Sequence, residues 1–102
     1  MFVILIQYRS SDAQINAVKQ QHKSFLKEQM EQGNIITSGP RTPNTGEVIL
    51  SCLQDMESLH ALLNQDPFYK KRIGQYQIIE FSPDNSCKQI EDLLTFYEEK
   101  EY

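Results

Sequence analysis

The sequence predicts an α+β domain in which a four-stranded antiparallel sheet carries two helices on one face. Its 102 residues are enough for one packed core and too few for two ordinary domains. Strand-like and helix-like segments follow one another in the order strand, helix, strand, strand, helix, strand. A split βαβ unit that is repeated once in this way usually forms such a sheet.

The first strand and the first helix have clear local signals. Residues 2–8 (FVILIQY) are rich in β-branched and aromatic side chains, and their apolar residues at both parities predict a central strand. Ser11 and Gln14 have the spacing of a capping box, and no Gly or Pro follows them before Gly33. We expect a long helix that ends at this glycine.

Two further strands and a second helix follow. Residues 34–40 (NIITSGP) and 47–53 (EVILSCL) predict strands, which a polar turn or longer hairpin loop connects. Asp55 can cap a short amphipathic helix. Its apolar residues have helical spacing: Met56, Leu59, Leu62 and Leu63.

The domain closes with one more helical turn and a fourth strand. Asp66 followed by Pro67 is a natural pair for an N-cap and a first turn, which predicts a helical turn ending at Gly74. Residues 75–81 (QYQIIEF) predict the last strand. We therefore assign residues 1–83 to a single domain with the ferredoxin-like βαββαβ arrangement.

A C-terminal extension follows Pro83. Ser86 and Gln89 repeat the capping-box spacing. An apolar row with helical spacing comes after them: Ile90, Leu93, Leu94 and Tyr97. We predict that residues 84–102 form an appended amphipathic helix with an acidic end.

The distribution of apolar residues in the predicted strands also bears on whether the chain forms an oligomer. The first and third predicted strands carry apolar residues on both faces, whereas two helices cover only one face of a sheet. Because a large apolar patch is seldom left in water, a second subunit or the C-terminal helix should cover the other face. We hypothesise a homodimer or a higher homo-oligomer.

Composition argues against several classes of function. The net charge of -4 repels phosphate backbones and anionic membrane surfaces, so we expect neither a nucleic-acid nor a membrane partner. No apolar run approaches the length of a membrane span and no leader-like segment follows Met1, which predicts a cytoplasmic protein. Cys52 and Cys87 are isolated, so we expect reduced thiols.

His22 occupies an unusual position in the long predicted helix. The spacing of Ile15, Phe25 and Leu26 places it near the centre of the apolar stripe that should face the sheet. One interpretation is a core histidine whose ring nitrogens are satisfied by a backbone carbonyl and water. The other is a general acid or base, because partial burial at a helix–sheet junction can adjust the pKa of a histidine.

A catalytic histidine needs a polar partner and room for a substrate. Asp66 could orient the imidazole, although an N-cap role alone would explain it, and the two roles are compatible. Ser38 is either a turn residue or a substrate ligand. Arg9 could bind an anionic group or could be a surface charge. His60, at the edge of its helix stripe, is expected to face solvent.

Several segments together resemble the YCII-related family of small bacterial proteins. They are FVILIQYR, QQHKSFLKEQMEQGNIITSGP, TGEVILSCL and LLNQDPFYKKRIGQYQIIEFSP, and the resemblance covers residues 1–83. It implies a dimeric α/β-barrel variant of the ferredoxin-like fold, with a pocket in which His22 and Asp66 form an acid/base pair. Ser38 is a weaker correspondence. The resemblance also implies small-molecule chemistry, since one relative is a dehydrochlorinase of a chlorinated hydroxyquinol.

Two functions follow as hypotheses. In the first, a cofactor-independent and metal-free enzyme of the lyase, isomerase or dehydrochlorinase type uses His22, oriented by Asp66, to move a proton on a small cyclic or anionic substrate. Arg9 and Ser38 would hold the oxygen groups of that substrate. In the second, a non-catalytic dimeric module binds a small ligand or a protein. Residues 84–102 depart from the family's short core, and they could extend a dimer interface, close the pocket or support a higher assembly.

Overall fold

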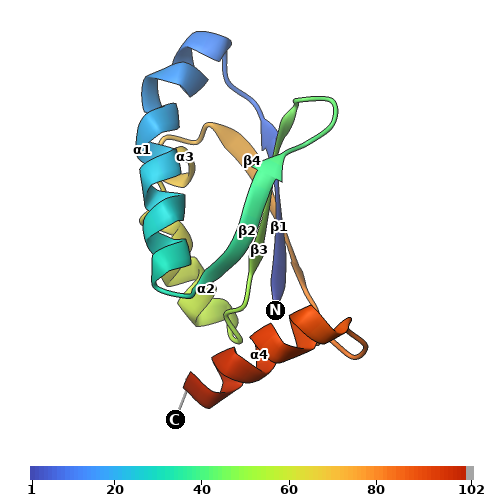
Figure 1. Cartoon of the computed structure of the whole chain (residues 1–102). Coiled ribbons are helices and arrows are strands. Elements are labelled where there is room, and N and C mark those ends of the chain that lie inside the picture. The colour runs from blue at the N-terminus through green and yellow to red at the C-terminus, as the bar shows by residue number, and fades with distance from the viewer. Residues whose placement is uncertain (101–102) are drawn as a thin grey trace.

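The computed structural model describes the backbone of residues 1–100 and the side chains of residues 1–95. The helices and strands are, in chain order, β1 (Phe2–Tyr8), α1 (Asp12–Glu31), β2 (Ile35–Pro40), β3 (Gly46–Ser51), α2 (Met56–Leu63), α3 (Pro67–Lys70), β4 (Gly74–Glu80) and α4 (Lys88–Lys100). The strands form one antiparallel sheet in the order β2-β3-β1-β4. Helices α1, α2 and α3 lie on one side of this sheet (Figure 1). The predicted ferredoxin-like α+β fold with an appended C-terminal helix is confirmed.

Both ends of α1 follow their sequence signals. Ser11 and Gln14 form the reciprocal capping box at the N-terminus. At the C-terminus Gly33 adopts a φ of 82°, and its N–H donates to the carbonyl of Met30 while the N–H of Asn34 donates to that of Gln29. These bonds make a Schellman motif, which needs a left-handed residue where the helix stops. The predicted glycine stop is confirmed.

The end of α3 differs from its prediction. The helix stops at Lys70, and the left-handed position after it is taken by Arg72, with a φ of 53°, instead of a glycine. Gly74 is the first residue of β4. A Cβ atom there would lie 2.6 Å from the carbonyl oxygen of Gln7, so this glycine allows the close approach of β4 to β1. The glycine therefore serves strand pairing and not helix termination.

The hydrophobic core lies between the sheet and the helices. The inward side chains of β1, which are Phe2, Ile4 and Ile6, are completely buried. They pack in one cluster with buried apolar residues of the other elements: Phe25, Leu26, Ile35, Ile49, Leu59, Leu62 and Leu63. A smaller cluster of Ile15, Phe68 and Ile73 adjoins α3. The site described below lies within this helix–sheet layer.

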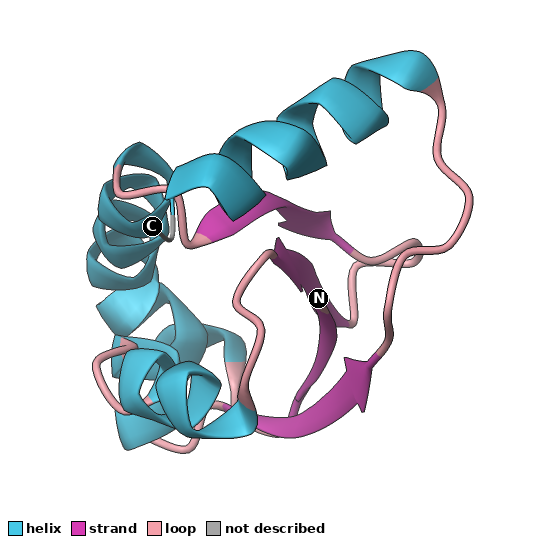
Figure 2. Cartoon of the chain, turned by 90° about the horizontal axis from the view of Figure 1, so that it is seen from below, coloured by secondary structure: helices cyan, strands magenta, loops and turns pink. Residues whose placement is uncertain are grey.

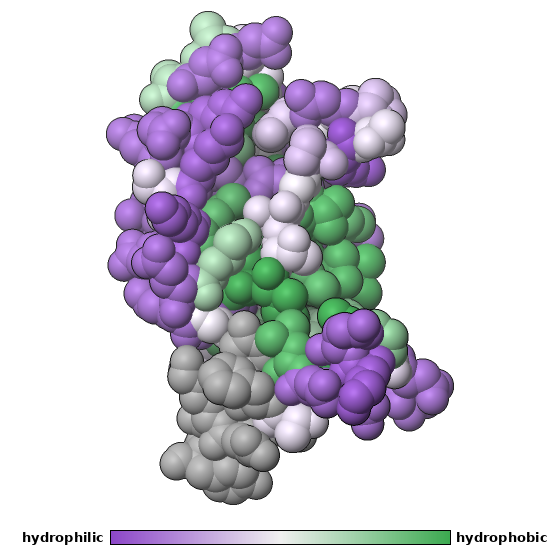
Figure 3. All heavy atoms as spheres, viewed as in Figure 1, coloured by the Kyte–Doolittle hydropathy of each residue, from purple (hydrophilic) through white to green (hydrophobic). Residues whose placement is uncertain are grey.

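The other face of the sheet is also apolar. Val3, Leu5, Val48 and Leu50 alternate with the core residues along β1 and β3 and are half-buried, while Ile79 is 43% exposed. Figure 3 shows hydrophobic surface gathered over the strands beside the hydrophilic outer surface of α1. The two-faced strand pattern is thus present in three dimensions. Its cover by a second subunit stays a prediction.

Helix α4 lies across the end of the sheet at which β1 begins (Figure 1). Figure 2 shows it running from the end of β4 toward the side where the other helices lie. It begins at Lys88, within the predicted segment 84–102, and the carbonyl of Cys87, not that of the predicted cap Ser86, accepts its first helical hydrogen bond, from the N–H of Glu91. Tyr97, the last residue of its predicted apolar row, lies outside the described side chains. Among the described residues, no helix is both long and apolar enough to cross a membrane.

Candidate functional site

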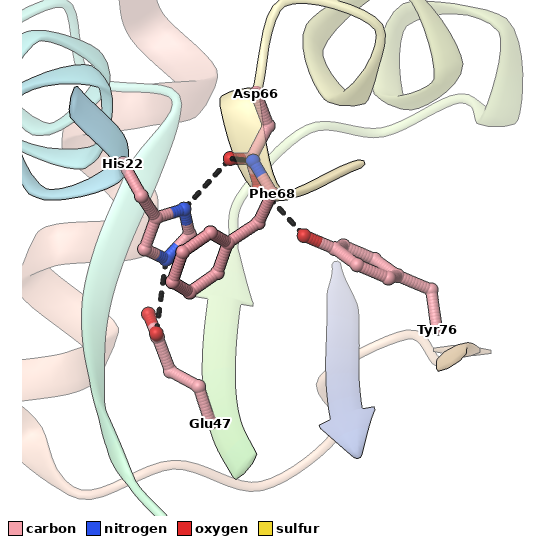
Figure 4. Close-up of polar contacts among 5 residues, drawn as sticks. All are labelled: His22, Glu47, Asp66, Phe68 and Tyr76. Carbon is pink, nitrogen blue, oxygen red and sulfur yellow. Dashed lines mark hydrogen bonds and ion pairs between the residues drawn. The ribbon is translucent and has the colours of Figure 1, made fainter. Parts of the chain in front are cut away.

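His22 is held between two carboxylates. Its Nδ1 lies 2.7 Å from Oδ1 of Asp66, and its Nε2 lies 2.9 Å from Oε2 of Glu47 (Figure 4). Carboxylates only accept hydrogen bonds when ionised, so the imidazole satisfies both of them best when each ring nitrogen carries a proton. The ring is 1% exposed. The geometry therefore favours a buried imidazolium.

Three hydrogen-bond donors hold the carboxylate of Asp66 in place. It is the N-cap of α3, where Oδ1 accepts a hydrogen bond from the backbone N–H of Phe68 at 3.0 Å as well as from His22. Its Oδ2 accepts a hydrogen bond from the hydroxyl of Tyr76 at 2.8 Å. The residue is completely buried. The helix-capping role and the contact with the imidazole thus occur together at one carboxylate.

Glu47 reaches His22 from β3. Its strand pairs with β1 so that Glu47 lies opposite Ile6, on the face that points toward the helices. The preceding Gly46 allows this pairing, since a Cβ atom there would lie 1.8 Å from the carbonyl oxygen of Ile6. Glu47 is 9% exposed, and its Oε1 is buried with no hydrogen-bond partner among the described residues.

Phe68 covers one face of the imidazole. The two rings are stacked, with centroids 3.8 Å apart and planes 8° apart. Phe68 is 1% exposed and also meets Tyr8 edge-on, at a centroid distance of 6.2 Å. The π-face of a phenyl ring attracts a cation, so this contact also favours the protonated imidazole.

The electrostatics of the cluster agree with its geometry. Burial alone would lower the pKa of His22, but the hydrogen bonds and negative charges of Asp66 and Glu47 outweigh it and raise the pKa to about 9. Burial, together with the charge of Asp66, raises the pKa of Tyr76. At neutral pH the tyrosine therefore stays a neutral donor to Asp66, and His22 stays positively charged.

A cavity of about 580 Å³ opens beside the cluster. It is lined by His22, Glu47 and Phe68, by Ser38 and Gly39 of β2, and by residues of α1 that include Lys19 and Lys23. This volume is within the range of small-molecule sites. The structure thus places three of the sequence-derived candidates in one region, with Ser38 and His22 on the wall and Asp66 directly behind His22.

Arg9 lies outside this group. Its guanidinium is exposed and donates to Oε1 of Gln75 at 2.6 Å, and it does not line the cavity. His60 is exposed on α2, as expected. Cys52 is half-buried and Cys87 exposed, and neither is in a disulfide. Within the described part of the chain, no group of three or more His, Cys, Asp or Glu side chains is arranged to hold a metal ion.

Glu47, Phe68 and Tyr76 were not singled out from the sequence. Glu47 carried a usable signal, because it has the same parity as the buried Ile49 and Ser51 in the third strand and is a charged residue at an inward position. A buried charge at such a position requires a partner. Tyr76 and Phe68 carried no comparable signal, since buried aromatic residues are common in any core.

Comparison with known proteins agrees with this architecture. The family described as YCII-related domain matches residues 1–82. Among solved structures, the chain is similar to the 5-chloro-2-hydroxyhydroquinone dehydrochlorinase of Burkholderia phenoliruptrix AC1100 in complex with 2,5-dihydroxybenzoquinone. The TM-score is 0.68 at 17% identity, over 81% of this chain and 94% of that one. No curated protein sequence matches the chain. The family match spans most of the chain, which therefore belongs to the YCII-related domain family.

Proposed function

We propose that this protein is a small cofactor-independent enzyme in which the acid–base cluster around His22 and Asp66 moves a proton on a cyclic organic substrate bearing oxygen substituents. The observation that carries the proposal is the buried 2.7 Å contact that Asp66 makes with His22, a residue that lines a cavity large enough for such a ring. A histidine that a buried carboxylate orients is the usual arrangement for general acid–base catalysis.

The surroundings of the cavity support a substrate with oxygen groups. Ser38 on its wall can donate to or accept from a hydroxyl or carbonyl oxygen, and Lys19 and Lys23 add positive charge on the α1 side. Apolar side chains of Ile15, Leu26 and Phe68 can contact a ring. Arg9, which bonds to Gln75 away from the cavity, has no part in this proposal.

The structural relative gives the first substrate to try. It is named a dehydrochlorinase of 5-chloro-2-hydroxyhydroquinone, a hydroxylated ring of the class that this cavity suits. Chloride release from that compound by the purified protein should be measured beside that of the His22→Gln variant. We expect the rate to fall by about a hundredfold to ten-thousandfold in the variant, which is the usual effect of losing general acid–base catalysis.

The exposed His60 provides a matched control. The His60→Gln variant should retain the wild-type rate, because this side chain faces solvent on α2. Equal rates for the wild type and His22→Gln would remove His22 from the mechanism. Binding of 2,5-dihydroxybenzoquinone without conversion of any chlorinated hydroxyquinol would instead favour a non-catalytic binding module.

A further inference from the structure

His22 has no ring nitrogen available for a substrate. Nδ1 is hydrogen-bonded to Asp66, Nε2 is hydrogen-bonded to Glu47, and Phe68 covers one ring face (Figure 4). A substrate in the cavity therefore cannot exchange a proton with His22 directly while both carboxylate contacts remain. The proton must pass through one of the two carboxylates.

The two carboxylates differ in whether an oxygen atom remains available to accept a further hydrogen bond. Asp66 is completely buried, and its oxygens already accept three hydrogen bonds, from His22, Phe68 and Tyr76. Glu47 uses only Oε2, and its Oε1 is buried without a partner among the described residues. Glu47 also lines the cavity, whereas Asp66 does not. A buried carboxylate oxygen without a donor is costly, so a ligand that supplies one is favoured.

We propose that Oε1 of Glu47 is the atom that binds and deprotonates an O–H or N–H group of the substrate. This inference rests on the proposed acid–base function and assigns its substrate-facing residue. His22 then acts as a positioning residue and carries the compensating positive charge behind Glu47. Asp66 and Tyr76 hold His22 in place.

The proton balance of this step is simple. The substrate O–H bond breaks, its electron pair stays on the substrate oxygen, and the proton forms a bond to Oε1. Before the step, two carboxylates and one imidazolium give the cluster a net charge of -1. After it the cluster is neutral and the substrate carries the negative charge. No oxidant, reductant or metal is required.

The free oxygen also defines the class of ligand. An acceptor-only anion, such as a carboxylate, would face Oε1 with no proton to share and would be repelled. A phenol or another neutral donor would supply the missing hydrogen bond. The part of the cavity that Glu47 lines should therefore select neutral hydroxyl groups over their methyl ethers.

Binding measurements can test this without turnover. Hydroquinone and 1,4-dimethoxybenzene share a ring, but only the first donates hydrogen bonds. We expect the wild type to prefer hydroquinone by about ten- to a hundredfold in Kd from NMR titration, since a hydrogen bond to a charged group is worth that much. In Glu47→Gln this preference should fall to about threefold or less. The exposed Glu57 gives the matched control Glu57→Gln, which should keep the preference.

A second measurement needs no variant. In protein labelled with ¹³C at glutamate carboxyl carbons, hydroquinone should shift the Glu47 signal more than any other, and 1,4-dimethoxybenzene should not. An unshifted Glu47 signal, or the same ligand preference in wild type and Glu47→Gln, would overturn the proposal. If the wild type converts no substrate, the proposed enzyme function fails, but the two binding measurements still decide whether Oε1 accepts the ligand's hydrogen bond. If it does convert one, Glu47→Gln should lower kcat by about a hundredfold or more.

Discussion

Phe68 lies flat against His22, with ring centroids 3.8 Å apart and planes 8° apart. The ring comes from α3 and the imidazole from α1, so this contact joins the two helices at the site. Phe68 also belongs to the smaller core cluster with Ile15 and Ile73. One side chain thus takes part in both the packing and the electrostatics of the cluster.

Phe68→Ala should destabilise the protein strongly. Removing a completely buried phenyl ring leaves a cavity, for which losses of about 3–5 kcal/mol in the free energy of unfolding are typical. Urea denaturation measures this loss. Phe81, which is 40% exposed, provides the comparison, and Phe81→Ala should change the free energy by about 0.5 kcal/mol or less. Similar losses in the two variants would contradict the packing described for Phe68.

Stability should fall as the pH rises from neutrality to about 9. The pKa of His22 is raised from 6.5 to about 9, so the folded state keeps a proton that the unfolded state has already lost. The stabilisation is fully present below pH 6.5 and is lost as the pH passes through the folded-state value, at a total of roughly 3 kcal/mol. Urea midpoints across this range should decline in the wild type. The decline should be much smaller in His22→Gln, and an equal decline would assign it to another group.

Tyr76→Phe should make His22 harder to deprotonate while weakening the fold. The hydroxyl of Tyr76 donates to Oδ2 of Asp66, so its loss leaves a buried carboxylate oxygen unpaired, at a cost of about 1–3 kcal/mol. The less-solvated carboxylate attracts the imidazolium more strongly, which raises the pKa of His22 further. ¹⁵N NMR of the imidazole follows this pKa. Tyr69, which meets Tyr76 edge-on, gives the control Tyr69→Phe, for which no such rise is expected.

The apolar outer face of the sheet should join two copies of the chain. Light scattering should give at least twice the mass of one chain, because Val3, Leu5, Val48 and Leu50 lie on a face that α1, α2 and α3 leave uncovered. Val48→Lys should reduce the mass to that of a monomer. Gln21→Lys, on the exposed side of α1, should leave it unchanged. A monomeric wild type at micromolar concentration would refute the prediction.

The fold could be predicted from the sequence because its signals are local. The capping box at Ser11, the stop at Gly33 and the N-cap at Asp66 each depend on residues within a few positions of one another. The role of Gly74 could not be predicted, since its requirement comes from the backbone of Gln7 across the sheet. The left-handed Arg72 also had no signal, because the tertiary structure holds it in a conformation that its own side chain does not favour.

Only part of the candidate site could be predicted from the sequence. Helical spacing placed His22 on an inward face, and the resemblance to the family supplied Asp66, 44 positions away. Glu47 was missed because its contact depends on the register between β3 and β1 and on the distance between the sheet and α1. Strand parity indicates which face a residue occupies, but not which side chain of a helix it meets.

The double use of Asp66 affects how variants of this protein should be interpreted. Because the same Oδ1 atom caps α3 and holds His22, an alanine at this position would lose activity through misfolding as readily as through chemistry. A screen that scores activity alone would merge the two causes. Asp66→Asn keeps one oxygen for the cap, but it removes the charge and turns the acceptor that faces the Tyr76 hydroxyl into an NH2 donor. The free energy of unfolding of this variant should therefore be measured beside its rate, so that a folding defect is distinguished from a catalytic one.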